Sequence, residues 1–121
     1  MINPYSEDER LQAMVSACYR ASRSHFSHLP IRQIINPPAD MFDAKLARQV
    51  AIHLLNVEFA IPRRRLVATL AVARWTVMQA VRVVDDRRLE PVFDSAYTRI
   101  AARSKDLFMT ALHEVAQEDA A

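Results

Sequence analysis

Few side chains of this sequence have the types and spacing that metal or thiol chemistry would use. His25 and His28 stand three positions apart, a spacing that suits two ligands of a zinc ion. His53, His113 and the single cysteine, Cys18, supply no second pair at ligand spacing, and two histidines in a polar connector are usually solvated. Cys18 falls on the apolar stripe of a predicted helix, which favours a core position over a reactive thiol. The sequence therefore predicts no metal ion and no cofactor.

Acidic pairs that could serve as general acid and base are also unconvincing. Asp85-Asp86 and Glu118-Asp119 fall at predicted helix ends, where they face water. No nucleophile with a base and an orienting group is visible along the chain, although such sets assemble in space. Glycine is absent, which excludes the phosphate-cradling loops of P-loop and dinucleotide-binding proteins. We predict that the protein is not an enzyme and has no small-molecule substrate.

Arginine is the residue type whose distribution indicates a function. Residues 61–90 hold seven arginines against three acidic residues, which makes this segment +4 in a chain of net charge +2. Such a field attracts phosphate, although an arginine-rich solvated surface would give the same count. Arg63, Arg64 and Arg65 fall in the first turn of a predicted helix, where cations oppose the helix dipole. A DNA phosphate docked at that N-terminus would offset the penalty.

The elements that must position these arginines are predicted to be helices. The chain has 121 residues, 51% of them apolar, which is enough to bury one core as a single all-α domain over residues 1–121. Apolar residues recur at helical spacing, while prolines and a capping box over Ser6–Glu9 mark the ends of the elements. The predicted helices, about six in number, cover roughly residues 7–24, 31–35, 41–57, 62–70, 73–86 and 90–118.

Two of these helices carry further expectations. The residues of the third helix that should face inward are Phe42, Leu46, Val50, Leu54 and Val57. The last helix, over residues 90–118, is long for a chain of this size and has an apolar stripe from Phe93 to Val115. Because DNA-binding proteins of this size often pair so that two helices enter successive grooves, we predict a homodimer.

Residues 61–88 fit a helix-turn-helix, in which a short turn joins two helices and the second helix enters the major groove of duplex DNA. The inward anchors that this unit needs are Leu66, Leu70, Val72, Val77 and Ala80 or Val81. Ala71 stands where the turn prefers glycine, and a non-glycine residue at positive φ costs on the order of 1 kcal/mol.

The outward surface of the second helix follows from that register, and it comprises Ala73, Arg74, Trp75, Met78, Gln79 and Arg82. Arginine and glutamine carry the donors that read guanine and adenine edges. Trp75 and Met78 could contact a thymine methyl, or they could equally be buried against a neighbouring helix.

Three segments, Ala47–Leu55, Ile61-Pro62 and Thr76–Ala80, resemble the C-terminal DNA-binding domain of the bacterial replication initiator DnaA. At these places that family carries an Arg-Gln helix, a Leu-Pro turn and a Thr-Thr-Val-Leu-His-Ala recognition helix. The resemblance covers residues 31–88 and implies a Trp-repressor-like helical fold that binds duplex DNA. The contacts that it implies are Arg74, Thr76 and Gln79.

The chain departs from this family at the residues that read DNA. The family's Gly-Gly-Arg-Asp-His-Thr stretch is replaced by Ala71-Val72-Ala73-Arg74-Trp75, and its Asp-His pair has no counterpart. Its basic loop is replaced by Asn36-Pro37-Pro38-Ala39-Asp40, and its ATPase domain has no counterpart in the sequence. We therefore expect phosphate contacts to dominate binding.

The function expected from the sequence is binding of double-stranded DNA in a bacterial regulator of transcription or replication initiation. The expected contacts are Arg63, Arg64, Arg65, Arg74, Trp75, Thr76, Gln79 and Arg82. The alternative is a degenerate helix-turn-helix scaffold that docks a protein through Trp75, Met78 and the last helix. One cysteine cannot form an internal disulfide, which fits the cytoplasm. No apolar run is long enough for a membrane span, so no membrane partner is expected.

Overall fold

The regular structure of the chain is helical throughout the part that the computed structural model describes, residues 6–120, with side chains to Gln117. Its elements are α1 (Glu7–His25), α2 (Ile31–Ile35), α3 (Phe42–His53), the π-helical turn η1 (Leu54–Glu58), α4 (Arg63–Leu70), α5 (Arg74–Arg87) and α6 (Pro91–Ala120). The prediction of a single all-α domain of about six helices is confirmed. Within these residues no single helix is both long and apolar enough to cross a membrane.

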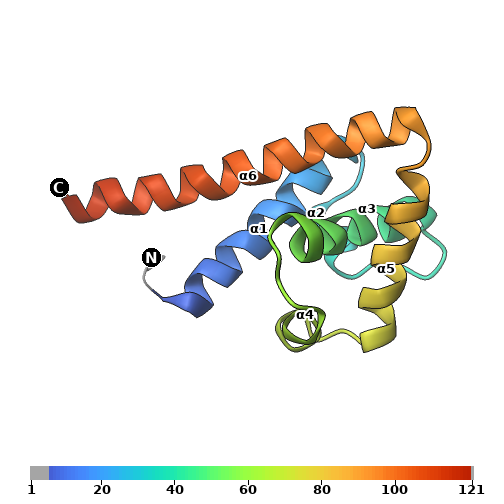
Figure 1. The fold of residues 1–121 in the computed structure, drawn as a ribbon, viewed down its shortest axis with the longest axis horizontal. Helices are drawn as coiled ribbons and strands as arrows, with labels where there is room; N and C mark the ends of the chain where they lie inside the picture. The colour runs from blue at the N-terminus through green and yellow to red at the C-terminus, as the bar shows by residue number, and fades with distance from the viewer. Residues whose placement is uncertain (1–5, 121) are drawn as a thin grey trace.

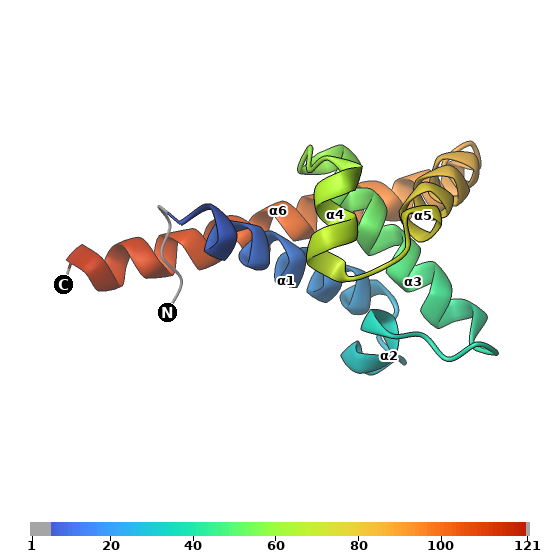
Figure 2. The same ribbon diagram turned by 90° about the horizontal axis from the view of Figure 1, so that it is seen from below.

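The long axis of the molecule is formed by α1 and α6, which lie side by side in both views (Figures 1 and 2). Helix α3 packs between α1 and α5, and α5 leads into α6 at the end of the molecule away from the start of α1 and the last turns of α6 (Figure 1). Helices α4 and α5 therefore stand at one end of the fold, while the last turns of α6 extend past the start of α1 (Figure 1).

The first helix begins as its sequence predicts. The Ser6 hydroxyl accepts a hydrogen bond from the Glu9 amide at 3.4 Å, which satisfies one of the free amides of the first turn. Cys18 is fully buried, so its predicted core position is confirmed. Burial raises the pKa of the Cys18 thiol far above its usual range, which keeps the thiol protonated and unreactive. The buried Ser22 hydroxyl donates to the Ala47 carbonyl at 2.7 Å and ties α1 to α3.

The third predicted helix is only partly correct. Leu46, Val50 and Leu54 are buried as expected, but Phe42 and Val57 are 64% and 46% exposed. Phe42 is the first residue of α3 and projects beyond the core. Val57 lies in η1, where the Phe59 amide bonds to the Leu54 carbonyl at 3.0 Å, five positions back. This wider turn breaks the 3.6-residue period on which the inward assignment of Val57 rested.

A hydrogen-bond network centred on the buried His53 ring joins three helices at the junction of α3 and η1. The His53 ring is inaccessible to solvent, and its Nδ1 and Nε2 lie 2.6 Å from the Tyr97 hydroxyl and 2.7 Å from Asp85 Oδ1. Because a carboxylate only accepts, Nε2–H donates to Asp85, while Nδ1 forms the hydrogen bond with the Tyr97 hydroxyl. His53 therefore links α3 to both α5 and α6 and fixes the orientation of α5.

Candidate nucleic-acid interface

The junction of α4 and α5 has helix-turn-helix geometry. Three residues, Ala71 to Ala73, join the two helices, and the chain bends by 119° between them. This angle lies at the upper end of the 90–120° range usual for the motif. Ala71 is left-handed, with φ 53° and ψ 45°, as expected at the turn position that prefers glycine.

The inward anchors hold both helices on the core. Leu66 of α4 and Val77 and Ala80 of α5 are fully buried, and Val81 is 5% exposed. Leu70 packs against the same core cluster. Val72, in the turn, is also packed against it. Because these side chains fix the rotation of α5 about its axis, they also determine which residues α5 presents to solvent.

The solvent-facing surface of α5 matches the predicted register. Arg74 and Arg82 are exposed, and Thr76 and Gln79 are half-buried. Trp75 is 69% exposed, and Met78 is 43% exposed. The sequence left open whether Trp75 and Met78 are buried against a neighbouring helix. In the structure neither of them lies in the core. The Trp75 ring is exposed to solvent on the second helix of this motif and is therefore available for contact with a partner.

The seven arginines near this junction fall into two groups. Three are engaged within the fold: Arg65 pairs with Glu7, Arg88 with Asp94, and Arg87 lies over the rings of Phe42 and Phe93. The other four form no ion pair with any acid among the described residues: Arg63, Arg64, Arg74 and Arg82. All four are exposed. Their charges are therefore free to meet phosphate.

Three of the unpaired arginines share one hollow. Arg63 and Arg64 at the start of α4, and Arg74 at the start of α5, line a space of 320 Å³ together with Val67 and Met78. Both helices begin here without an acidic residue in their first turns. The positive ends of two helix dipoles therefore add to the three guanidinium charges.

A second hollow, of 310 Å³, brings residues of α3 beside α5. Trp75, Thr76 and Gln79 line it from α5, and Lys45 and Arg48 line it from α3. Lys45 and Arg48 are not among the DNA contacts expected from the sequence. Their three-residue spacing places both on one side of α3. The Arg-Gln pair of the DnaA resemblance was the signal that could have identified Arg48.

The other end of α5 carries two carboxylates beside its arginines. Asp85 and Asp86 share a hollow of 420 Å³ with Trp75, Arg82 and Arg63. Because Asp85 accepts from His53 at 2.7 Å, it is fixed in place rather than free to swing away. The two carboxylates weaken the positive field around Arg82, so phosphate approach is favoured most strongly at the N-terminal end of α5.

Arg65, expected among the DNA contacts, has an acidic partner inside the fold. Its Nη1 lies 2.8 Å from Glu7 Oε1, and its Nη2 lies 3.8 Å from Asp8 Oδ1. Both carboxylates are well exposed, at 81% and 96%, so the pairs are weakly stabilising. Arg65 is nevertheless turned toward α1, whereas Arg63 and Arg64 line the hollow beside α5.

The side chains of Glu118 and Asp119 lie outside the described residues, and the described histidines, Cys18 and Asp85-Asp86 do not come together in one metal or catalytic site. No group of three or more His, Cys, Asp or Glu side chains able to hold a metal lies within the described residues. His28 lies 3.1 Å from Asp43. The hydrogen bonds run from Tyr97 through His53 to Asp85, the order of a proton relay, but His53 and Tyr97 are buried and out of reach of a substrate. Burial, with a smaller effect from the Glu58 carboxylate, raises the pKa of Tyr97 and keeps its hydroxyl protonated.

The chain matches no protein-family model, no curated protein sequence and no solved structure.

Proposed function

We propose that this protein binds double-stranded DNA through the helix-turn-helix formed by α4 and α5. The observation that carries the proposal is the set of four exposed arginines, Arg63, Arg64, Arg74 and Arg82, which surround the solvent-facing surface of α5 and pair with no acid in the part of the chain that the structure describes. Phosphate is the chemical group that such a set attracts, and a helix N-terminus is the place where phosphate docks.

The proposed arrangement places α5 in the major groove with Trp75, Thr76 and Gln79 toward the bases. Gln79 can donate to and accept from an adenine edge, and the Trp75 ring offers an apolar surface to a thymine methyl. Lys45 and Arg48 would then face the backbone on the α3 side of the groove. The proposed contacts to phosphate outnumber those to bases, so sequence preference should be modest.

A relation to the C-terminal domain of the initiator DnaA belongs to this proposal. It is supported by the all-α fold and by the left-handed turn at Ala71. It is also supported by the segments that resemble that domain, Ala47–Leu55, Ile61-Pro62 and Thr76–Ala80. The role that we propose is regulation of transcription or replication initiation in a bacterial cytoplasm, without catalysis. Two copies would pair so that two α5 helices reach successive grooves, and light scattering at high micromolar concentration should give a dimer mass.

The experiment that tests DNA binding is fluorescence anisotropy with a labelled duplex of mixed sequence, measured at several salt concentrations. Four phosphates neutralised by the four arginines alone give a slope of log affinity against log salt of about −3.6, and contacts from Lys45 and Arg48 would make it steeper. From 50 to 200 mM salt, affinity should therefore fall roughly 100-fold. Absence of binding at 50 mM salt to any duplex would contradict the proposal.

A protein-docking scaffold is the second candidate function, and the exposure of Trp75 and Met78, 69% and 43%, favours it. Aromatic and methionine side chains of this kind are common at the centre of protein interfaces. The two functions differ in their response to salt. Binding to a protein through Trp75 would change little between 50 and 200 mM salt, whereas DNA binding would weaken steeply.

A further inference from the structure

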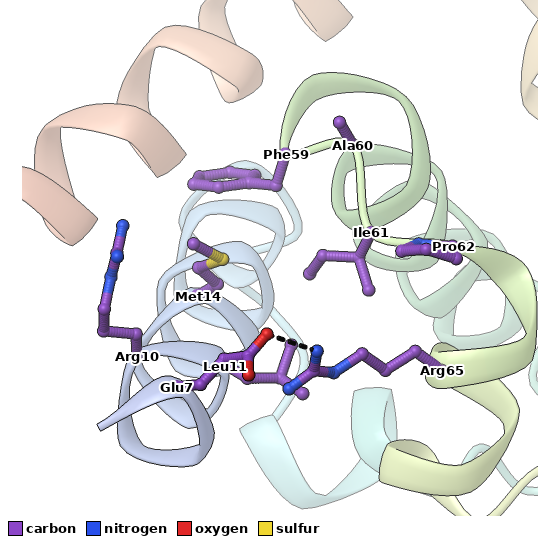
Figure 3. A pocket seen from close by; sticks show the side chains of 9 residues that line it. All are labelled: Glu7, Arg10, Leu11, Met14, Phe59, Ala60, Ile61, Pro62 and Arg65. Carbon is purple, nitrogen blue, oxygen red and sulfur yellow. Dashed lines mark hydrogen bonds and ion pairs between the residues drawn. The ribbon is translucent and has the colours of Figure 1, made fainter. Parts of the chain in front are cut away.

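A hollow of 290 Å³ lies between the first turns of α1 and the segment that joins η1 to α4 (Figure 3). It shares no lining residue with the hollows around Trp75 and the four unpaired arginines. Its volume is close to the lower limit of pockets that hold small ligands, about 300 Å³. The DNA-binding proposal makes no use of it.

The walls of this hollow are apolar and held in place. Met14, Phe59 and Ile61 point toward the same space from two sides (Figure 3), and Leu11 closes it below. Leu11 and Ile61 are buried in the core, 7% and 6% exposed. The Phe59 ring packs edge to face on Phe108 with 5.6 Å between the ring centroids. The apolar surface is therefore preformed and does not need a ligand to organise it.

The mouth of the hollow carries more positive than negative charge. Arg10 and Arg65 line it with a single carboxylate, that of Glu7. Arg10 is exposed and pairs with no acid among the described residues. The Glu7–Arg65 pair, at 2.8 Å, spans the opening (Figure 3), but the Glu7 carboxylate is 81% exposed. An exposed pair is worth about 0–1 kcal/mol, so another carboxylate can replace Glu7 at Arg65.

We propose that this hollow binds a small amphipathic monocarboxylate of the arylacetic acid type. The apolar body would lie between Met14, Phe59 and Ile61, and the carboxylate would pair with Arg65 and, at longer range, with Arg10. At the ~30 Å³ that a water molecule occupies, 290 Å³ holds about ten non-hydrogen atoms, which is the size of phenylacetate. This proposal does not depend on DNA binding, because the carboxylate is titrated into the protein without DNA.

The experiment uses protein labelled with ¹³C at the methionine methyl groups, titrated with phenylacetate. The Met14 methyl lines the hollow, whereas the exposed Met78 and Met109 lie on α5 and α6 and serve as internal controls. The expected result is a saturable shift of the Met14 signal with the control signals unmoved. Phenethylamine, of similar size but opposite charge, should produce no saturable shift. No saturation with phenylacetate, or an equal response to the amine, would overturn the proposal.

Three variants separate binding from a structural effect. Arg65→Gln should weaken phenylacetate binding by up to about fivefold, since the exposed carboxylate–guanidinium pair is lost. Glu7→Gln should tighten it, because the competing carboxylate is gone. Arg20→Gln, on an exposed part of α1 outside the hollow, should leave the affinity unchanged. Circular dichroism checks that each variant is helical. Weaker binding in Glu7→Gln, or equal affinities in the two arginine variants, would contradict the assignment.

Discussion

Replacing Ala71 by glycine should stabilise the protein, although glycine usually weakens a helical fold. Ala71 has φ 53° and ψ 45°, a conformation in which the Cβ of an L-residue is crowded by about 1–2 kcal/mol. Glycine removes this crowding but adds freedom to the unfolded chain, which costs roughly 0.4–1 kcal/mol. The net effect should be a gain of up to about 1 kcal/mol in the free energy of unfolding, or about 4 °C in Tm.

The same substitution three residues earlier should have the opposite effect. Ala68 is exposed and lies within α4, where glycine costs roughly 0.5–1 kcal/mol relative to alanine. Ala71→Gly and Ala68→Gly thus make the same chemical change in different backbone conformations. Ala60, with φ 54°, provides a second left-handed position at which glycine should stabilise.

The assay is thermal unfolding of the wild type and the three variants, followed by circular dichroism under identical conditions. The expected order of Tm is Ala71→Gly above the wild type and Ala68→Gly below it. If Ala71→Gly lowers Tm as much as Ala68→Gly does, Ala71 is not in the left-handed conformation. The helix-turn-helix geometry would then be wrong at its turn.

Other predictions concern the core and the arginines. His53→Leu should lower the free energy of unfolding by about 1–3 kcal/mol in urea denaturation, because it leaves the buried Tyr97 hydroxyl without a partner. Adding Tyr97→Phe to His53→Leu should recover part of that loss. If the losses of the two single variants simply add in the double variant, the network is contradicted. Burial raises the pKa of both Cys18 and Tyr97, so the unfolded chain releases protons that the folded chain keeps, above about pH 8.5 for the thiol and above about pH 10 for the phenol. Stability should therefore be complete below about pH 8.5 and fall, for each group, by up to about 1.4 kcal/mol per pH unit above the unfolded pKa of that group, with no fall between pH 8.5 and 10 in Cys18→Ala; a flat wild-type profile to pH 10 would refute this. Arg65→Gln should weaken DNA binding less than Arg74→Gln in anisotropy titrations, because Arg65 is paired with Glu7; the reverse order would show that Arg65 faces the DNA.

The sequence predicted the helices well because local rules set their ends. Pro62 precedes α4, the Ser6 cap precedes α1, and Pro91 starts α6, so these boundaries follow from backbone chemistry alone. The π-helical turn η1 was not predictable in this way. It depends on the tertiary placement of the residues after His53, and the apolar sequence reads equally well as a continuing α-helix.

The sequence predicted which side chains of α5 face solvent, but not which residues of other helices lie beside them or pair with them. The periodicity of α5 indicated which residues face outward, because Val77 and Ala80 had to face inward. Nothing in the local sequence showed that Glu7, 58 positions earlier, pairs with Arg65. The same limit applied to Lys45, which reaches the surface beside Trp75 only through the packing of α3 on α5.

The central claim is that the unpaired arginines around α5 bind the phosphates of duplex DNA. The most direct test is the salt slope of duplex affinity in single arginine-to-glutamine variants, with circular dichroism to verify folding. Arg63→Gln, Arg74→Gln and Arg82→Gln should each make the slope less steep by about 0.9. The matched control is Arg88→Gln, whose guanidinium already pairs with Asp94 at 2.7 Å and should not affect the slope. Equal slopes in all four variants and the wild type would contradict the account.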